Sequence, residues 1–217
     1  MNRNTLVIGT AIIAALLFVG GWFVVDRSTA PVLETATSAP TGSALIRFHS
    51  PVLGPQNAPV TIVEFFDPAC EACRAMHPVL ADIRKQYPDQ VRIVMRYAAF
   101  HDGSDIAVRI LETARLQNIF EPVLDALLAA QPQWADHSGP RLDIAWAAAA
   151  KAGLDVDKAR ADMNSKAIDN VLSQDAGDIK TIGVRRTPTF FVDGRPLLDF
   201  GAKQLMEMVR LQVEAKS

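Results

Sequence analysis

The stretch VTIVEFFDPACEAC, residues Val60–Cys73, decides the fold of this chain. Its first half, Val60–Phe66, is mostly apolar and rich in branched and aromatic side chains, which is typical of a buried strand. Its second half carries Cys70 and Cys73, the two cysteines of the chain, just before a segment with a helical period. Because the N-terminal end of a helix stabilises negative charge, this placement predicts a redox-active pair with a reactive thiolate at Cys70.

The composition of the 217-residue chain is that of a globular protein with a packed core. Hydrophobic residues make up 49% of the chain and charged residues 21%. With a net charge of −2, the chain lacks the excess of basic residues that binds phosphate groups, which excludes nucleic acid as a partner. Two cysteines cannot form the disulfide framework of a small secreted domain. Stability must therefore come from packing, and the cysteine pair is free for chemistry.

Residues Leu6–Val25 form a run of twenty uncharged, mostly apolar residues, long enough to cross a bilayer as one helix. Arg3 and the free amino terminus precede the run, whereas Asp26, Arg27 and Glu34 follow it. This asymmetry predicts a cytoplasmic N-terminus and export of the remainder. The sequence therefore predicts a single-pass anchor in residues 1–25 of a cytoplasmic (inner) membrane protein, with its catalytic domain on the periplasmic or extracytoplasmic side.

The same N-terminal run is open to a second interpretation, a cleaved signal peptide. Ser28-Thr29-Ala30 is similar to a small-residue cleavage site, but the apolar run is longer than a signal core and Pro31 would follow the cut. Either interpretation places the bulk of the protein outside the cytoplasm. Residues 26–44, rich in Ser, Thr, Ala and Pro, are predicted to be a flexible linker to a globular region at 45–217.

The globular region is predicted to be an α/β domain, a mixed sheet covered by helices. Strands are expected at 60–66, 91–97, 189–192 and 195–199, the last two joined by a hairpin turn. Helices are expected at 71–87, 142–152, 157–164 and 202–215, with further helical periods around 106–114, 120–128 and 168–182.

Three separated features resemble the thioredoxin fold. They are the strand before Cys70–Cys73, the helix after it with Pro78 inside, and Thr187-Pro188 directly before a strand. The helical stretch at about 102–182 resembles the inserted helical domain of the DsbA-like branch of thiol-disulfide oxidoreductases. Over residues 45–217, the resemblance implies a thioredoxin fold with a helical insertion and an enzyme that exchanges disulfides with exported, cysteine-containing client proteins.

Thiolate chemistry and the resemblance together assign roles to four residues. Cys70 is expected to form the mixed disulfide with the client, and Cys73, one helical turn further and more buried, is expected to resolve it. The resemblance implies a cis bond at Pro188 and a backbone contact between Thr187 and the client chain. Neither a metal nor a cofactor is expected.

Glu64 lies six residues before Cys70, where the family carries a buried acid beneath the active site. A carboxyl group in an apolar strand is costly unless it is paired or protonated. We expect Glu64 to relay the proton that Cys73 loses before it attacks a mixed disulfide. The alternatives are exposure to solvent or an ion pair with Arg96, a partner that the resemblance also suggests.

The dipeptide Glu71-Ala72 between the cysteines departs from the Pro-His typical of strong oxidants in this family. A carboxylate beside Cys70 disfavours its thiolate, which predicts an intermediate reduction potential. An oxidase recharged by a membrane redox partner linked to quinone is favoured. A reductase or isomerase of the same fold, fed by a membrane electron donor, is the alternative.

A Cu(I)-handling protein is the alternative from a different class. Cys70, Cys73, Met76 and His77 offer soft ligands within eight residues. However, Met76 shares a helical stripe with Leu80 and is expected in the core, and His77 is expected on the helix surface. The remaining histidines, which have no metal-site spacing, are interpreted as loop or surface residues: His49, His101 and His137.

Overall fold

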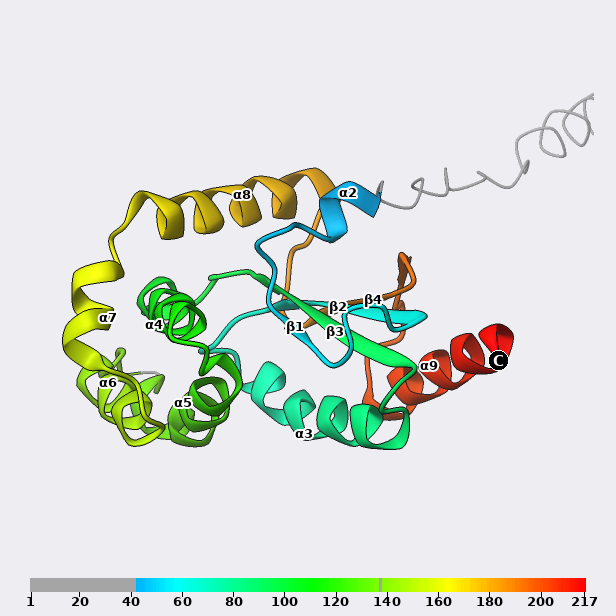
Figure 1. The fold of residues 1–217 in the computed structure, drawn as a ribbon, viewed down its shortest axis with the longest axis horizontal. Coiled ribbons are helices and arrows are strands. Elements are labelled where there is room, and N and C mark those ends of the chain that lie inside the picture. The colour runs from blue at the N-terminus through cyan, green and yellow to red at the C-terminus, as the bar shows by residue number, and fades with distance from the viewer. Residues whose placement is uncertain (1–41, 137) are drawn as a thin grey trace, which may run out of the picture. The chain divides into compact units, whose positions relative to one another are not determined.

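The computed structural model describes residues 42–136 and 138–217 of the chain (Figure 1). The predicted membrane helix at Leu6–Val25 lies outside these residues, as does most of the predicted linker. Within the part that the structure describes, no helix has both the length and the apolar character needed to cross a bilayer.

Five strands of the described chain form one mixed sheet in the order β1-β3-β2-β4-β5. The central strands β2 (Val60–Phe66) and β3 (Val91–Tyr97) are parallel, and Ile62 pairs with Ile93. The remaining strands pair antiparallel with their neighbours. These outer strands are short: β1 (Val52–Leu53), β4 (Thr189–Val192) and β5 (Arg195–Pro196). All seven residues of β2 are buried, as its nearly continuous apolar sequence predicts.

Helices cover both faces of the sheet (Figure 1). On one face, α3 (Glu71–Gln86) and α9 (Ala202–Lys216) pack against alternate β2 residues, Ile62 and Phe66, in the main hydrophobic core. On the other face, the short α2 (Gly42–Leu45) and α8 (Lys166–Ile182) enclose Val63, Phe65 and other apolar side chains in a smaller core. The alternation of side chains along a strand places neighbouring β2 residues in different cores.

A group of helices is inserted between β3 and β4, as the sequence predicts. Besides α8, they are α4 (Ser104–Leu116), α5 (Phe120–Trp134), α6 (Leu142–Lys151) and α7 (Val156–Asp162). Trp134 is fully buried, and its indole N–H donates to the carbonyl oxygen of Leu127 at 2.8 Å. Gly183 ends α8 in the left-handed conformation, as expected for a helix C-terminus.

The structure corrects the predicted elements in three places. The last strand was expected to reach Asp199 but ends at Pro196, followed by one more hydrogen bond from the Leu197 N–H to the Phe190 carbonyl oxygen at 2.9 Å. Strand β1 and helix α2 were not predicted, because two and four residues are too short to show a period. His49, interpreted as a loop or surface residue, is buried, with its Nε2 atom 2.9 Å from Asp175 Oδ1.

Candidate active site

The two cysteines lie at the N-terminal end of α3. Cys70 is the N-cap residue in an extended conformation, and the helix begins at Glu71. Both cysteines are free thiols; Cys73 is fully buried and Cys70 is 6% exposed. The backbone N–H of Asp67 donates to Cys73 Sγ at 3.5 Å, which holds the second sulfur under the loop that precedes the helix. Both cysteines are therefore buried; Cys70 keeps a small exposed fraction, and Cys73 keeps none.

The pKa values of the two thiols are shifted in opposite directions. A hydrogen bond from the Cys73 thiol is the largest of several influences that lower the pKa of Cys70 to about 5, and the Thr187 side chain and the backbone N–H groups of Ala72 and Cys73 add to it. Burial, together with the hydrogen bond to Cys70, raises the pKa of Cys73 far above its ordinary value. At neutral pH, Cys70 is thus a thiolate and Cys73 its protonated partner.

Thr187 and Pro188 lie directly beside Cys70, although they are distant in the sequence. The Thr187–Pro188 peptide bond is cis, as the resemblance implies. The Thr187 carbonyl oxygen is 3.2 Å from Cys70 Sγ, a contact between residues 117 positions apart. The buried Thr187 hydroxyl has no other hydrogen-bond partner among the described residues, so it is available to donate to the Cys70 thiolate.

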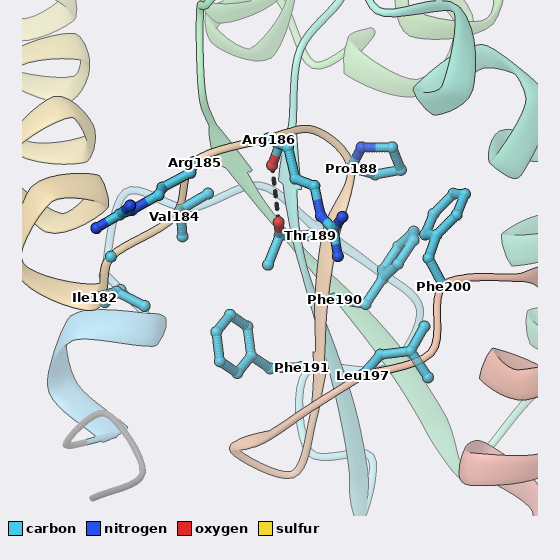
Figure 2. Close-up of a pocket in the computed structure, with 11 residues that line it drawn as sticks. Ile182, Val184, Arg185, Arg186, Pro188, Thr189, Phe190, Phe191, Leu197 and Phe200 are labelled. Atoms are coloured by element: carbon cyan, nitrogen blue, oxygen red, sulfur yellow. Dashed lines mark hydrogen bonds between the residues drawn. The ribbon is translucent and has the colours of Figure 1, made fainter. Parts of the chain in front are cut away.

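A cavity of about 380 Å³ follows the loop that carries Pro188 (Figure 2). The Phe190 and Phe200 rings stack in it with their centroids 6.5 Å apart, and Leu197 lies below them. The Thr189 hydroxyl donates to the Arg186 carbonyl oxygen and holds the loop in shape. The loop next to Cys70 therefore borders a hollow that is lined by apolar side chains together with Arg185 and Arg186.

Glu64 is buried in β2, on the same sheet face as Ile62 and Phe66 and therefore on the side of α3. Its Oε1 atom has no hydrogen-bond partner among the described residues. Burial, with a smaller effect from the negative charge of Cys70, raises the pKa of Glu64 to about 8. The charge of Glu64 in turn raises the pKa of Cys73. The carboxyl group is thus protonated at neutral pH and electrostatically coupled to both sulfurs.

The suggested ion pair between Glu64 and Arg96 is wrong. Arg96 is opposite Phe65 in the ladder, one position along from Glu64, so its side chain lies on the other face of the sheet. There its guanidinium group is 5.5 Å from the Phe65 ring centroid and binds Asp175 and Asp178 at 2.7 and 2.6 Å. Arg96 therefore joins β3 to α8 and has no contact with the candidate site.

Asp67, which the sequence analysis overlooked, links two loops of the site. It is fully buried and accepts hydrogen bonds from the backbone N–H groups of Ala69, Phe100 and His101, and from the Ser104 hydroxyl. His101 Nδ1 is 2.7 Å from Asp67 Oδ2. A signal was available, because Asp67 and His101 follow the adjacent parallel strands β2 and β3, whose carboxyl ends meet at one edge of the sheet.

Gln131 of α5 is a second residue that the sequence did not indicate. Its amide nitrogen donates to the carbonyl oxygens of Pro68 and Cys70 at 2.7 and 3.0 Å, and its amide oxygen accepts from Arg74 Nε at 2.8 Å. No sequence signal identifies it, because it is one amide on a long amphipathic helix.

The side chains considered for copper do not converge. Met76 packs in the main core, as expected. His77 Nε2 is 2.7 Å from Asp125 Oδ1 of α5, away from the cysteines along α3. Within residues 42–136 and 138–217, no three His, Cys, Asp or Glu side chains gather so that they could hold a metal ion.

Solved structures share this fold. A thioredoxin-like oxidoreductase from Silicibacter pomeroyi is 27% identical, with a TM-score of 0.69 over 82% of this chain and 99% of that one. BdbD from Bacillus subtilis in its oxidised form is 20% identical, with a TM-score of 0.68 over 76% of this chain and 94% of that one.

Among curated proteins, a Na⁺/H⁺ antiporter NhaA from Herminiimonas arsenicoxydans is 34% identical over 146 residues, or 67% of this chain. The chain spans 22% of that antiporter's length. A family model described as thioredoxin matches residues 48–210. With its thioredoxin-like α/β fold, helical insertion and cysteine pair, the chain belongs to the thioredoxin family.

Proposed function

We propose that the protein exchanges the Cys70–Cys73 disulfide with cysteine-containing client proteins outside the cytoplasm, acting as an oxidase. The observation that carries the proposal is the opposed acidity of the pair. Cys70, whose pKa is about 5, is held against Thr187 and borders an open cavity, whereas the fully buried Cys73 keeps its proton. Such a pair has one sulfur suited to exchange with a client and one suited to resolution.

The exchange proceeds in two steps that move two electrons. A client thiolate attacks Cys70 Sγ of the disulfide, an S–S bond forms between client and Cys70, and Cys73 leaves as a thiolate that takes up a proton. A second client thiolate then attacks the client sulfur of this mixed disulfide and releases Cys70 as a thiolate. The client gains a disulfide and Cys70–Cys73 is reduced. The low pKa of Cys70 favours this direction, because it makes Cys70 a good leaving group.

We propose that the client chain lies along the Thr187–Pro188 loop. The loop backbone is adjacent to Cys70, as the 3.2 Å contact with the Thr187 carbonyl oxygen demonstrates. The hollow beside it, with Phe190 and Phe200, accommodates an apolar side chain that flanks the client cysteine (Figure 2). Backbone contacts supply affinity without strict sequence dependence, which suits an enzyme with several clients.

Glu64 is proposed to relay the proton of Cys73. Its protonated carboxyl group lacks a partner at Oε1, and its charge, when present, raises the pKa of Cys73. When Cys73 must leave as a thiol in the oxidising direction, Glu64 donates a proton. When Cys73 must attack in the reverse direction, the Glu64 carboxylate accepts one.

The reduction potential is expected to be intermediate. A pKa of about 5 for Cys70 is between the value of about 3.5 for a strong oxidase and about 7 for thioredoxin. The Glu71 carboxylate next to Cys70 is consistent with this position, since it opposes the thiolate. Reductase or isomerase activity of the same pair is the alternative, and the potential distinguishes the two.

The location and the recycling partner are proposed from the N-terminal sequence. The apolar run at Leu6–Val25, with its excess of positive charge on the N-terminal side, indicates a single-pass anchor in the cytoplasmic membrane and an extracytoplasmic catalytic domain. A tether of this kind would keep the domain near a membrane redox partner that reoxidises Cys70–Cys73 by accepting two electrons.

Two measurements test the proposal. The equilibrium of Cys70–Cys73 with glutathione gives the reduction potential: a value near −120 mV marks a strong oxidant, and a value near −270 mV marks a thioredoxin-like reductant. The Cys73→Ser variant should trap mixed disulfides with exported proteins, and the double variant with Cys70→Ser is the control. Absence of adducts in Cys73→Ser, while Cys70 still reacts with small alkylating reagents, would reject client exchange.

A further inference from the structure

His101 shares a cavity with Cys70. The cavity has a volume of about 540 Å³ and lies between the start of α3, the loop after β3 and the loop after α5. Among the described residues that line it, His101 is the one whose side chain can carry positive charge; the other ionisable lining residues are acids or Cys70 itself: Glu71, Asp102 and Asp136. The dipeptide Glu71-Ala72 supplies no cation, so any cation at this thiolate must come from another segment.

Asp67 fixes the position of the His101 ring. Its Oδ2 atom is 2.7 Å from His101 Nδ1 and accepts the His101 backbone N–H at 3.0 Å, so the ring and its loop are held together. A carboxylate at Nδ1 keeps a proton on that atom and leaves Nε2 to gain or lose one. The Asp67 side chain is fully buried, whereas the His101 side chain is 52% exposed. The ring is therefore anchored at one nitrogen and open to the cavity elsewhere.

Asp67 also positions the cysteine loop. Its Oδ1 atom accepts the backbone N–H of Ala69 at 2.9 Å, and its carbonyl oxygen accepts the backbone N–H of Cys70 at 3.1 Å. One buried residue thus sets the location of both the His101 ring and the Cys70 backbone. Displacement of either relative to the other would break hydrogen bonds in a buried environment, which is costly.

The charges around His101 favour its protonated form. Asp67 at the end of β2, Cys70 at the start of α3 and Asp102 on the same loop all act on it, and the remaining acids of the cavity are Glu71 and Asp136. The hydrogen bond to Asp67 is the largest influence that raises the pKa of His101, and the charges of Asp67, Cys70 and Asp102 add to it against a smaller effect of burial.

We propose that His101, oriented by Asp67, is an electrostatic positioning residue for disulfide exchange: its imidazolium form stabilises the Cys70 thiolate across the shared cavity. The proposal deepens the proposed function and rests on it. Stabilisation of the thiolate stabilises the reduced pair and makes the disulfide a stronger oxidant. The positive charge of His101 stabilises the Cys70 thiolate in addition to the local hydrogen bonds, which have the larger effect. Because the imidazole gains and loses this charge with pH, the oxidising power of the pair depends on pH in the same range.

The first test uses the wild-type protein and the reciprocity of coupled titrations. The histidine ring signals are followed by NMR against pH in the reduced and the disulfide forms. The pKa of His101 should be higher in the reduced form, because the thiolate charge is absent from the disulfide. His77, which pairs with Asp125, is the internal control and should titrate identically in both forms. Equal pKa values of His101 in the two forms would overturn the proposal.

The second test replaces His101 with Gln, which retains a donor for Asp67, and compares it with His77→Gln. Thiolate absorbance and the rate of Cys70 alkylation are measured against pH. At pH 5, His101→Gln should lower the alkylation rate about three- to fivefold, the size of an interaction between partly solvated charges. His77→Gln should match wild type, and His101→Lys should restore the rate and remove the imidazole titration. A wild-type rate in His101→Gln would refute the idea.

The two levels of the proposal can fail separately. If Cys73→Ser traps no client while His101→Gln still weakens the Cys70 thiolate, the proposed function is wrong and the electrostatic role of His101 stands. If clients are trapped and His101→Gln leaves the thiolate unchanged, only the role of His101 is wrong.

Discussion

The side-chain amide of Gln131 donates a hydrogen bond to the carbonyl oxygen of Cys70 at 3.0 Å. Gln131 belongs to α5 in the helical insertion, whereas Cys70 is the N-cap residue of α3, the helix that follows β2. The same amide binds the carbonyl oxygen of Pro68 and the side chain of Arg74. The helical insertion therefore holds the active-site loop in place through hydrogen bonds to its backbone.

Replacing Gln131 with Leu should destabilise this loop. The change leaves the buried carbonyl oxygen of Pro68 without its donor and that of Cys70 with the backbone N–H of Arg74 alone, at a cost of about 1–3 kcal/mol. Urea unfolding measures the loss, and faster hydrogen exchange in the residues around Cys70 locates it. The exposed Gln133, two positions along the same helix, provides the control: Gln133→Leu should leave both measurements unchanged. Equal effects of the two variants would contradict the assigned support.

The acidity of Cys70 should depend on Cys73 as a donor. The hydrogen bond from the Cys73 thiol is the largest influence that lowers the pKa of Cys70 to about 5. Cys73→Ala removes this donor and should raise the pKa, with the alkylation rate at pH 6 falling at least about tenfold. Cys73→Ser keeps a donor and should have the smaller effect. A titration of Cys73→Ala that still centres near 5 would show that the helix N-terminus alone controls the thiolate.

Glu64 should make the protein less stable as the pH rises. Its pKa is raised from about 4.5 to about 8, so the folded state retains a proton that the unfolded state releases. The associated stability is complete below about pH 4.5 and is lost as the pH rises towards 8, by roughly 3 kcal/mol at pH 7.

The Glu64→Gln variant provides the comparison for this effect. An amide does not titrate, so its stability should lack the component that wild type loses between pH 5 and pH 8. Urea unfolding at intervals across this range measures both proteins. Parallel stability curves for the two proteins would mean that Glu64 is ionised, or exposed, throughout.

Arg96 should be essential for the attachment of α8. Its guanidinium group is fully buried and binds both Asp175 and Asp178. Its removal by Arg96→Met leaves the buried Asp175 without its arginine, whereas Asp178 keeps only Arg47. Breaking a buried pair from one side costs about 3–5 kcal/mol. Arg92 on the same strand, half-buried and bound to Thr61, is the matched control. Arg92→Met should cost less than about 1 kcal/mol in the same unfolding experiment.

The same cluster predicts instability in acid. The hydrogen bond from Arg47 is the largest influence that lowers the pKa of Asp178, and Arg96 adds to it. A lowered pKa supplies stability that is present above the ordinary range of a carboxyl group and is lost as the pH falls through it. Arg47→Gln should therefore flatten the acid side of the stability curve. A curve that is unchanged in this variant would place the acid sensitivity elsewhere.

Local patterns were sufficient for most of the elements. The strands Val60–Phe66, Val91–Tyr97 and Thr189–Val192 have the predicted bounds. The predicted helices differ by one or two residues at their ends, except the one expected around 120–128, which continues to Trp134. These elements bury long, strongly patterned apolar stretches, so their own residues decide their structure. Short elements such as β1 lack a period, and their pairing depends on a neighbour that the local sequence does not contain.

Local patterns did not predict which side chains contact one another in the candidate active site. Glu64 was correctly expected to be costly in an apolar strand. Its alternative partner Arg96 lies on the opposite face of the sheet, because Arg96 is paired with Phe65 and successive residues along a strand point to opposite faces. Asp67, His101 and Gln131 were not selected, because each polar residue is unremarkable by itself and acquires its partners only from packing.

The sequence by itself determined the strand, the cysteine pair and the helix that starts behind it, because hydrophobic period and the helix terminus are local properties of the chain. Only the tertiary structure decided which groups surround Cys70. It brings Thr187 from 117 residues away, Gln131 from 61 residues away, and His101 through a bond to Asp67 across 34 residues. The physical reason is that a buried polar group must find a partner, and the partner is whichever group the packed elements place within hydrogen-bond distance.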